Sequence, residues 1–109
     1  MLRWMMSAGL LLCAGAADAA MPGELQTEMI ACESRGLMVR ALELIDQNDN
    51  RAADELWRRG RLAGTCRIFY KGDKIILEAR EMTSGLSKIH KPGEPNAFWI
   101  VNFAIDPRQ

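Results

Sequence analysis

Few side chains in this sequence suit acid–base or nucleophilic chemistry, and their spacing does not assemble a catalytic group. The single histidine, His90, lies three residues after Ser87. Residues an odd number apart on a strand point to opposite faces, so this serine and histidine should not meet as nucleophile and base. Glu78, Glu81 and Glu94 show no spacing that selects the carboxylate pair of a glycosidase. We therefore predict that the protein is not an enzyme.

Motifs that bind metals or cofactors are also missing from the sequence. It contains no glycine-rich phosphate loop, no His-Glu-x-x-His motif and no calcium loop. The turn at residues 71–74 carries too few carboxylates for a hard cation. A zinc site needs more ligands than His90 and a few cysteines supply. We expect neither a metal nor a cofactor.

The first residues of the chain have the features of a cleavable secretory signal. Arg3 supplies a positive charge, and residues 4–17 are uncharged and mostly Leu, Met, Ala and Gly. The segment Ala17-Asp18-Ala19 fits the small-x-small pattern of a signal peptidase site, so we expect cleavage after Ala19 or Ala20. The apolar run is shorter than the roughly 20 residues of a membrane span. The sequence thus predicts a periplasmic or secreted protein without an integral span in its mature chain.

Cleavage would turn an odd number of cysteines into a matched pair. Cys13 lies in the signal, where the preceding Leu12 departs from the Gly or Ala of a lipoprotein signal. Cys32 and Cys66 remain, and an oxidising compartment favours their disulfide. Such a bridge closes a loop of about 35 residues and would stabilise the fold by roughly 3.5–4 kcal/mol. The absence of a C-x-x-C motif argues against a redox pair.

Charge and length limit the mature chain further. The full sequence has 14 basic and 14 acidic residues, and the signal removes one of each, Arg3 and Asp18. A balanced charge argues against a nucleic-acid binder, which needs a clustered positive field. It also argues against a polybasic membrane-surface module. Residues 20–109 are long enough for one small domain.

The first half of this domain has helical periodicity. Apolar residues recur at three- and four-residue spacing from about residue 34 to residue 61, with an interruption at 47–50 where Asp or Asn can cap a second helix. Gly60 and Gly64 are expected to end that second helix. The pattern predicts an antiparallel helical hairpin. For residues 23–31, an early start of the first helix and a separate helical turn both stay open.

The second half, about residues 65–105, changes toward the two-residue period of strands. Turns and loops are expected at residues 71–74, 83–85 and 91–96, where glycine and proline concentrate. The strands expected between them comprise residues 66–70, 75–80, 86–90 and 97–105. We therefore predict an α+β fold in which an N-terminal helical hairpin packs on a small antiparallel barrel or sheet.

Three short motifs lie in this β region: Gly72-Asp73-Lys74-Ile75, Gly85-Leu86-Ser87-Lys88-Ile89, and Gly93 followed by Phe98-Trp99-Ile100. With the order of the strands, they resemble the bacterial SH3-like family of small barrels, over less than half of the chain. The resemblance implies a peptide- or cell-wall-binding module.

The aromatic residues suggest where a ligand would bind. Trp57 and Phe69 are expected in the core, with Trp57 docking the hairpin onto the sheet. Alternation separates Phe98 from Trp99, so one of these two should face outward. An outward aromatic ring beside a polar side chain is a common recognition platform. The candidate ligand-binding residues are Tyr70, Lys88, His90 and Trp99, and for Tyr70 and Trp99 a core position stays open.

These observations predict a non-catalytic binding module of the bacterial envelope, whose partner is a protein, a peptide or a cell-wall glycan. One alternative is an accessory subunit whose hairpin packs on a larger assembly through Met38 and Leu44. Another is an inhibitor of a secreted hydrolase that acts through the loop at residues 91–96. The arginines of the second helix and first strand are either a second binding surface or solvated charges that complement the helix dipole: Arg58, Arg59, Arg61 and Arg67.

Overall fold

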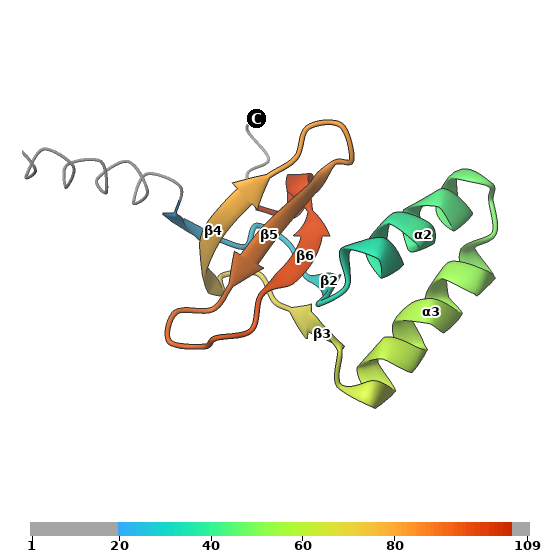
Figure 1. Ribbon diagram of the computed structural model, residues 1–109, viewed down its shortest axis with the longest axis horizontal. Helices are drawn as coiled ribbons and strands as arrows, with labels where there is room; N and C mark the ends of the chain where they lie inside the picture. The colour runs from blue at the N-terminus through green and yellow to red at the C-terminus, as the bar shows by residue number, and fades with distance from the viewer. Residues whose placement is uncertain (1–19, 106–109) are drawn as a thin grey trace, which may run out of the picture.

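The computed structural model describes residues 20–105, and the export signal expected for residues 1–19 lies outside the described residues. The described chain is α+β, with two helices and an antiparallel sheet of six strands (Figure 1). Within these residues, no helix has the length and apolar run that crossing a membrane requires.

The sheet has the strand order β1-β4-β5-β6-β2-β3. Its strands are β1 (Met21–Glu24), β2 (Met29–Cys32), β3 (Cys66–Phe69), β4 (Lys74–Arg80), β5 (Leu86–His90) and β6 (Phe98–Val101). Strands β4, β5 and β6 follow one another as antiparallel neighbours. Strand β2 lies between β6 and β3, so residues from both ends of the described chain meet in the middle of the sheet.

The expectation of helical structure at residues 23–31 is wrong, because this segment contributes β1 and β2. Strand β1 pairs with β4, from Met21 opposite Leu77 to Glu24 opposite Lys74. Strand β2 is covered on both faces, because Ala31 packs in one apolar cluster and Cys32 in another, so the strand is apolar throughout and shows no two-residue period. The hairpin is therefore not N-terminal to the β region, but is inserted between the paired strands β2 and β3.

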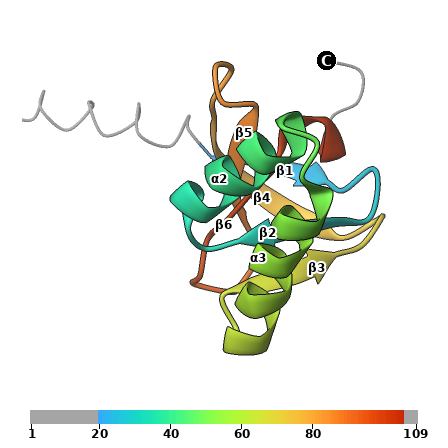
Figure 2. The same cartoon turned by 90° about the vertical axis from the view of Figure 1, so that its right-hand side faces the viewer.

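The two helices begin at capped residues. Helix α2 (Arg35–Asp46) follows Ser34, whose Oγ accepts the backbone N–H of Leu37 at 3.0 Å. Helix α3 (Asn50–Ala63) follows Asp49, whose Oδ1 accepts the backbone N–H of Ala52 at 3.2 Å. These caps satisfy N–H groups that the helix itself leaves free. The helices pack against each other as the hairpin predicted from the sequence (Figure 2).

Of the two glycines expected to end α3, only Gly64 does so, with a left-handed φ of 83°. Gly60 lies inside α3 and is buried. A Cβ atom at this position would lie 2.2 Å from Cys66 Sγ, closer than two such atoms can approach. The missing side chain lets α3 pass directly over the disulfide between Cys66 and Cys32.

Two apolar clusters occupy the two faces of the sheet. The inner core lies on one face and contains Leu25, Ala31, Phe69, Ile75, Ile89, Phe98, Ile100, Ala104 and Ile105. The hairpin core lies on the other face, beneath the helices, and contains the disulfide, Met38 and Leu86, with Trp57 and Trp99 packed against them. Trp57 also contacts the cluster between α2 and α3, so it joins the hairpin to the sheet as expected.

The last expected strand is shorter than the sequence pattern indicated. Strand β6 ends at Val101, and a short 3-10 helix, η2 (Asn102–Ala104), follows. The backbone N–H of Asn102 donates to the carbonyl of Gly85 at 2.8 Å, which turns the chain back toward the β4–β5 turn. This turn buries Ala104 in the inner core and leaves Phe103 61 % exposed.

Candidate binding site

The register of β5 and β6 brings three of the four candidate ligand-binding residues onto one face of the sheet. Lys88 lies directly opposite Trp99. His90 is two residues after Lys88 on the same strand, so its side chain points to the same face. This is the face that carries Leu86 and the hairpin core. The site thus borders the hairpin, rather than lying on an isolated sheet surface.

Glu78 of β4 completes this group. The pairing of β4 with β5 shifts register between Leu77 and Ala79, and the extra residue is Glu78. Such a bulge re-aims the side chain of the residue that it inserts. Glu78 Oε2 lies 2.5 Å from His90 Nδ1, and its Oε1 lies 3.8 Å from Lys88 Nζ. We call Glu78, Lys88, His90 and Trp99 the outer patch.

The contact with Glu78 orients the imidazole of His90. An ionised carboxylate only accepts hydrogen bonds, so His90 Nδ1 donates to Glu78. In the neutral ring, the other nitrogen, Nε2, then becomes the acceptor that is left for a ligand. The Lys88 ammonium nearby supplies donors. The patch can therefore both donate and accept hydrogen bonds.

Trp99 is half-buried, because the start of α2 lies over it. The guanidinium of Arg35 lies 5.8 Å from the centre of the Trp99 ring. Arg35 also binds both carboxylate oxygens of Glu81, with Nη2 2.9 Å from Oε1. Hydrogen bonds from Arg35 and from Ser84 Oγ hold the pKa of Glu81 below its usual value. Phe98 and Trp99 point to opposite faces: Phe98 is buried in the inner core, whereas Trp99 is only partly buried against the hairpin core.

Tyr70 is not part of the outer patch. It follows the edge strand β3, and strand β2 separates β3 from β6 in the sheet. Tyr70 is 55 % exposed, so it lies on the surface and not in the core, the two positions that the sequence left open. The Tyr70 backbone N–H donates to Asp73 Oδ2 at 2.9 Å, which lowers the pKa of Asp73. Tyr70 therefore belongs to the β3–β4 turn.

Ser87 is not placed to act as a nucleophile with His90 as its base. The Ser87 side chain is fully buried, and its hydroxyl donates to Asn102 Oδ1. Asn102 in turn donates from Nδ2 to the Glu81 carbonyl at 3.1 Å. Among residues 20–105, no group of three or more His, Cys, Asp or Glu side chains is placed to hold a metal ion.

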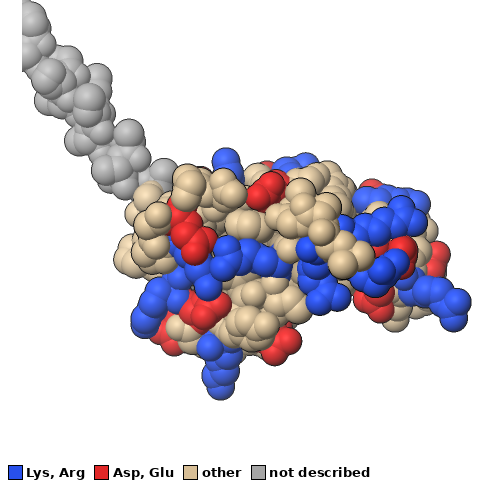
Figure 3. Space-filling model, turned by 90° about the horizontal axis from the view of Figure 1, so that it is seen from below, with Lys and Arg blue, Asp and Glu red and all other residues tan. Residues whose placement is uncertain are grey.

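The arginines considered as a second surface are divided between two places. Arg58 and Arg59 both bind Glu55 on their own helix, at 2.8 and 3.1 Å. Arg67 instead binds Glu94 at 2.9 Å and lies 5.1 Å from the centre of the Phe69 ring, where it covers the edge of the inner core. On the face shown in Figure 3, basic and acidic side chains are interspersed. Arg58 and Arg59 therefore share Glu55 on α3, whereas Arg67 pairs with Glu94 beside β3.

The apolar residues proposed for an accessory subunit are not available on the hairpin surface. Met38 is 1 % exposed and lies in the hairpin core, and Leu44 is 7 % exposed between the helices. The expectation of an outward patch at these two residues is wrong. The large apolar residues that are exposed are others: Ile45 and Leu62 on the hairpin helices, and Met21, Tyr70, Met82 and Phe103 outside them.

Sequence reasoning missed Glu78 and Arg35 as neighbours of the candidate residues. A β4–β5 hairpin was expected, but its bulge, which decides where Glu78 points, has no local sequence signal. Arg35 reaches Trp99 only because α2 is inserted after β2, next to β6.

We found no family model, curated protein or solved structure that matches this chain.

Proposed function

We propose that this protein is a non-catalytic binding module of the bacterial envelope, working in the periplasm or outside the cell after export. The observation that carries the proposal is the outer patch, in which Lys88 lies opposite Trp99 and Glu78 contacts both Lys88 and His90 on the same face. A half-covered indole gives a ligand apolar contact area, and the surrounding groups fix its orientation by hydrogen bonds.

The charges around the patch favour a ligand of mixed polarity. Lys88 and Arg35 contribute two cations, and Glu78 and Glu81 contribute two carboxylates. A strongly anionic partner would be repelled by the two carboxylates, and a strongly cationic partner would be repelled by the two cations. Peptidoglycan suits such a site, since its sugars carry hydroxyl and amide groups and its stem peptides carry both charges. We propose peptidoglycan as the ligand.

We further propose that the β region has an SH3-like arrangement and forms one domain with the hairpin. The sequential antiparallel strands β4, β5 and β6 support this assignment. So do Gly72, Gly85 and Gly93 of the three resembling motifs, which all adopt positive φ angles. These turns depend on glycine, because other residues rarely adopt that conformation.

The proposal can be tested with purified peptidoglycan sacculi. We expect the unmodified mature protein to sediment with sacculi, and Lys88→Ala and His90→Gln to bind at least several-fold more weakly, because each removes a polar contact of the patch. Lys71→Ala, which alters the exposed β3–β4 turn, is the matched control and should bind like the unmodified protein. Lack of retention by sacculi, or equal binding by all variants, would contradict the proposal.

A further inference from the structure

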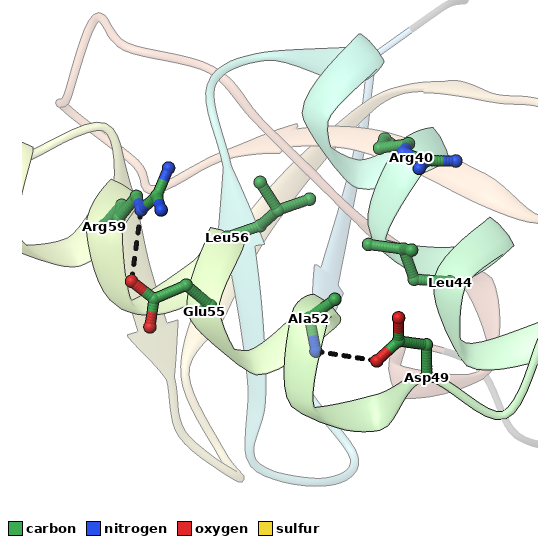
Figure 4. Close-up of a pocket in the computed structure, with 7 residues that line it drawn as sticks. All are labelled: Arg40, Leu44, Asp49, Ala52, Glu55, Leu56 and Arg59. Atoms are coloured by element: carbon green, nitrogen blue, oxygen red, sulfur yellow. Dashed lines mark hydrogen bonds and ion pairs between the residues drawn. The ribbon is translucent and has the colours of Figure 1, made fainter.

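The two helices enclose a shallow groove that the outer patch does not use. Its volume is about 350 Å³, and it is open to solvent between α2 and α3 (Figure 4). The residues that line it are Arg40 and Leu44 from α2, with Asp49, Ala52, Glu55, Leu56 and Arg59 from α3 and its cap.

The floor of the groove is apolar and hollow. Leu44 and Leu56 stand on either side of Ala52, whose single methyl group leaves the space between them unfilled (Figure 4). Leu44 also belongs to the cluster with Ala41 and Ala53 that holds the helices together. The hollow therefore suits one large aliphatic side chain from another molecule.

The charges on the α3 side of the groove change sign along the helix. Asp49 lies at the helix start, and Arg59 lies near its end with a side chain that is 70 % exposed. Glu55 lies between them and is already bound by Arg58 and Arg59. The groove-lining face of α3 thus has an acid, Asp49, at one end and a base, Arg59, at the other, so this face is complementary to a copy of itself in the antiparallel direction.

We propose that the groove binds the α3 helix of a second copy of this chain, so that two hairpins pair about a two-fold axis near residue 54. Residue 54 lies midway in sequence between Ala52 and Leu56, and it also lies midway between Asp49 and Arg59. One register therefore places Leu56 of each copy against the partner's Ala52 hollow, and Arg59 against the partner's Asp49. Glu55 lies beside the axis, where Arg58 of its own helix neutralises it.

Sedimentation velocity across the micromolar range tests this pairing. The unmodified protein should form a concentration-dependent dimer. Arg59→Glu should weaken it about tenfold or more, because it sets two acids against each other, whereas Arg59→Lys should weaken it far less. Leu62→Ser, which changes an exposed leucine on α3 outside the groove, is the control and should leave the dimer intact. A monomer at every concentration would overturn the proposal.

Disulfide trapping tests the register itself. Two copies of residue 55 would be offset by about 3 Å along the helix axis, whereas two copies of residue 62 would be offset by about 24 Å. Oxidised Glu55→Cys should therefore form a covalent dimer, and Leu62→Cys should not. Cross-linking at Leu62→Cys but not at Glu55→Cys would show another interface and overturn the proposal.

Discussion

At the scale of single residues, the contact between Gly60 and the disulfide determines how closely α3 packs on the sheet. Cys32 and Cys66 are both buried, and they join paired positions of β2 and β3 at the base of the hairpin. The backbone of α3 lies against Cys66 at Gly60, where any side chain would collide with the sulfur. A glycine normally weakens a helix interior, so here its packing outweighs that cost.

We predict that Gly60→Ala destabilises the protein by about 1–3 kcal/mol, since the overpacking exceeds the gain in helix propensity. Chemical denaturation would measure the loss. Gly36→Ala is the matched control, because Gly36 lies on the exposed side of α2 and a methyl group added there would lie 3.8 Å from its nearest neighbour, Ser34 Oγ. That variant should be as stable as the unmodified protein or slightly more stable. A Gly60→Ala protein of unchanged stability would contradict the tight contact.

At the scale of elements, the hairpin is held to the sheet at both of its ends. The disulfide and the Gly60 contact hold the end of α3, and Arg35 holds the beginning of α2. Arg35 bridges from the first turn of α2 to Glu81, just after β4, and its guanidinium lies over Trp99 of β6. The orientation of the hairpin therefore determines how much of Trp99 a ligand can reach.

We predict a small but measurable favourable coupling between Arg35 and Glu81, because the guanidinium binds both carboxylate oxygens but the pair is exposed. A double-mutant cycle with Arg35→Gln and Glu81→Gln, followed by urea denaturation, measures it. The pair Arg40 and Glu43 within α2 serves as a comparison, since it is more exposed and joins residues of one helix. Its coupling should be smaller, and an equal value would argue against a special role for Arg35.

The elements differ in how far the sequence could predict them. The helices, the cap of the second helix near Asp49 and the turn at Gly72 depend on local spacing, and the structure has the expected pair of helices and the expected strands there. Strand β2 could not be predicted in the same way, because its place between β6 and β3 depends on residues far along the chain. The same is true of Glu78, whose position depends on the register between β4 and β5.

At the scale of the whole molecule, three carboxylates in different parts of the fold are stabilised in their charged form by nearby hydrogen-bond donors. The Arg35 side chain holds the pKa of Glu81 below its usual value, and the Tyr70 N–H does the same for Asp73. Glu55 has a lowered pKa because Arg58 and Arg59 bind it. Each group binds protons less readily in the folded state than in the unfolded state.

We predict that the folded protein loses stability in acid. Because the folded pKa values of these carboxyls lie below the unfolded ones of about 4, their contribution is complete above that pH and disappears as the pH falls through the folded values. Denaturation midpoints measured between neutral and acidic pH should show this decrease, and Asp73→Asn should reduce its size. A midpoint that rises on acidification would contradict the assigned ion pairs and hydrogen bonds.

The most direct measurement of the proposed function is a titration of the mature protein with soluble peptidoglycan fragments, followed by amide and indole NMR signals. We expect the largest shifts at Lys88, His90, Glu78 and the Trp99 indole, with smaller shifts at Arg35 and none at Tyr70. Those residues share one sheet face beside the hairpin, whereas Tyr70 follows the edge strand. Absence of shifts at saturating fragment, or shifts centred on Tyr70 or on the far end of the hairpin, would contradict the outer patch as the binding site.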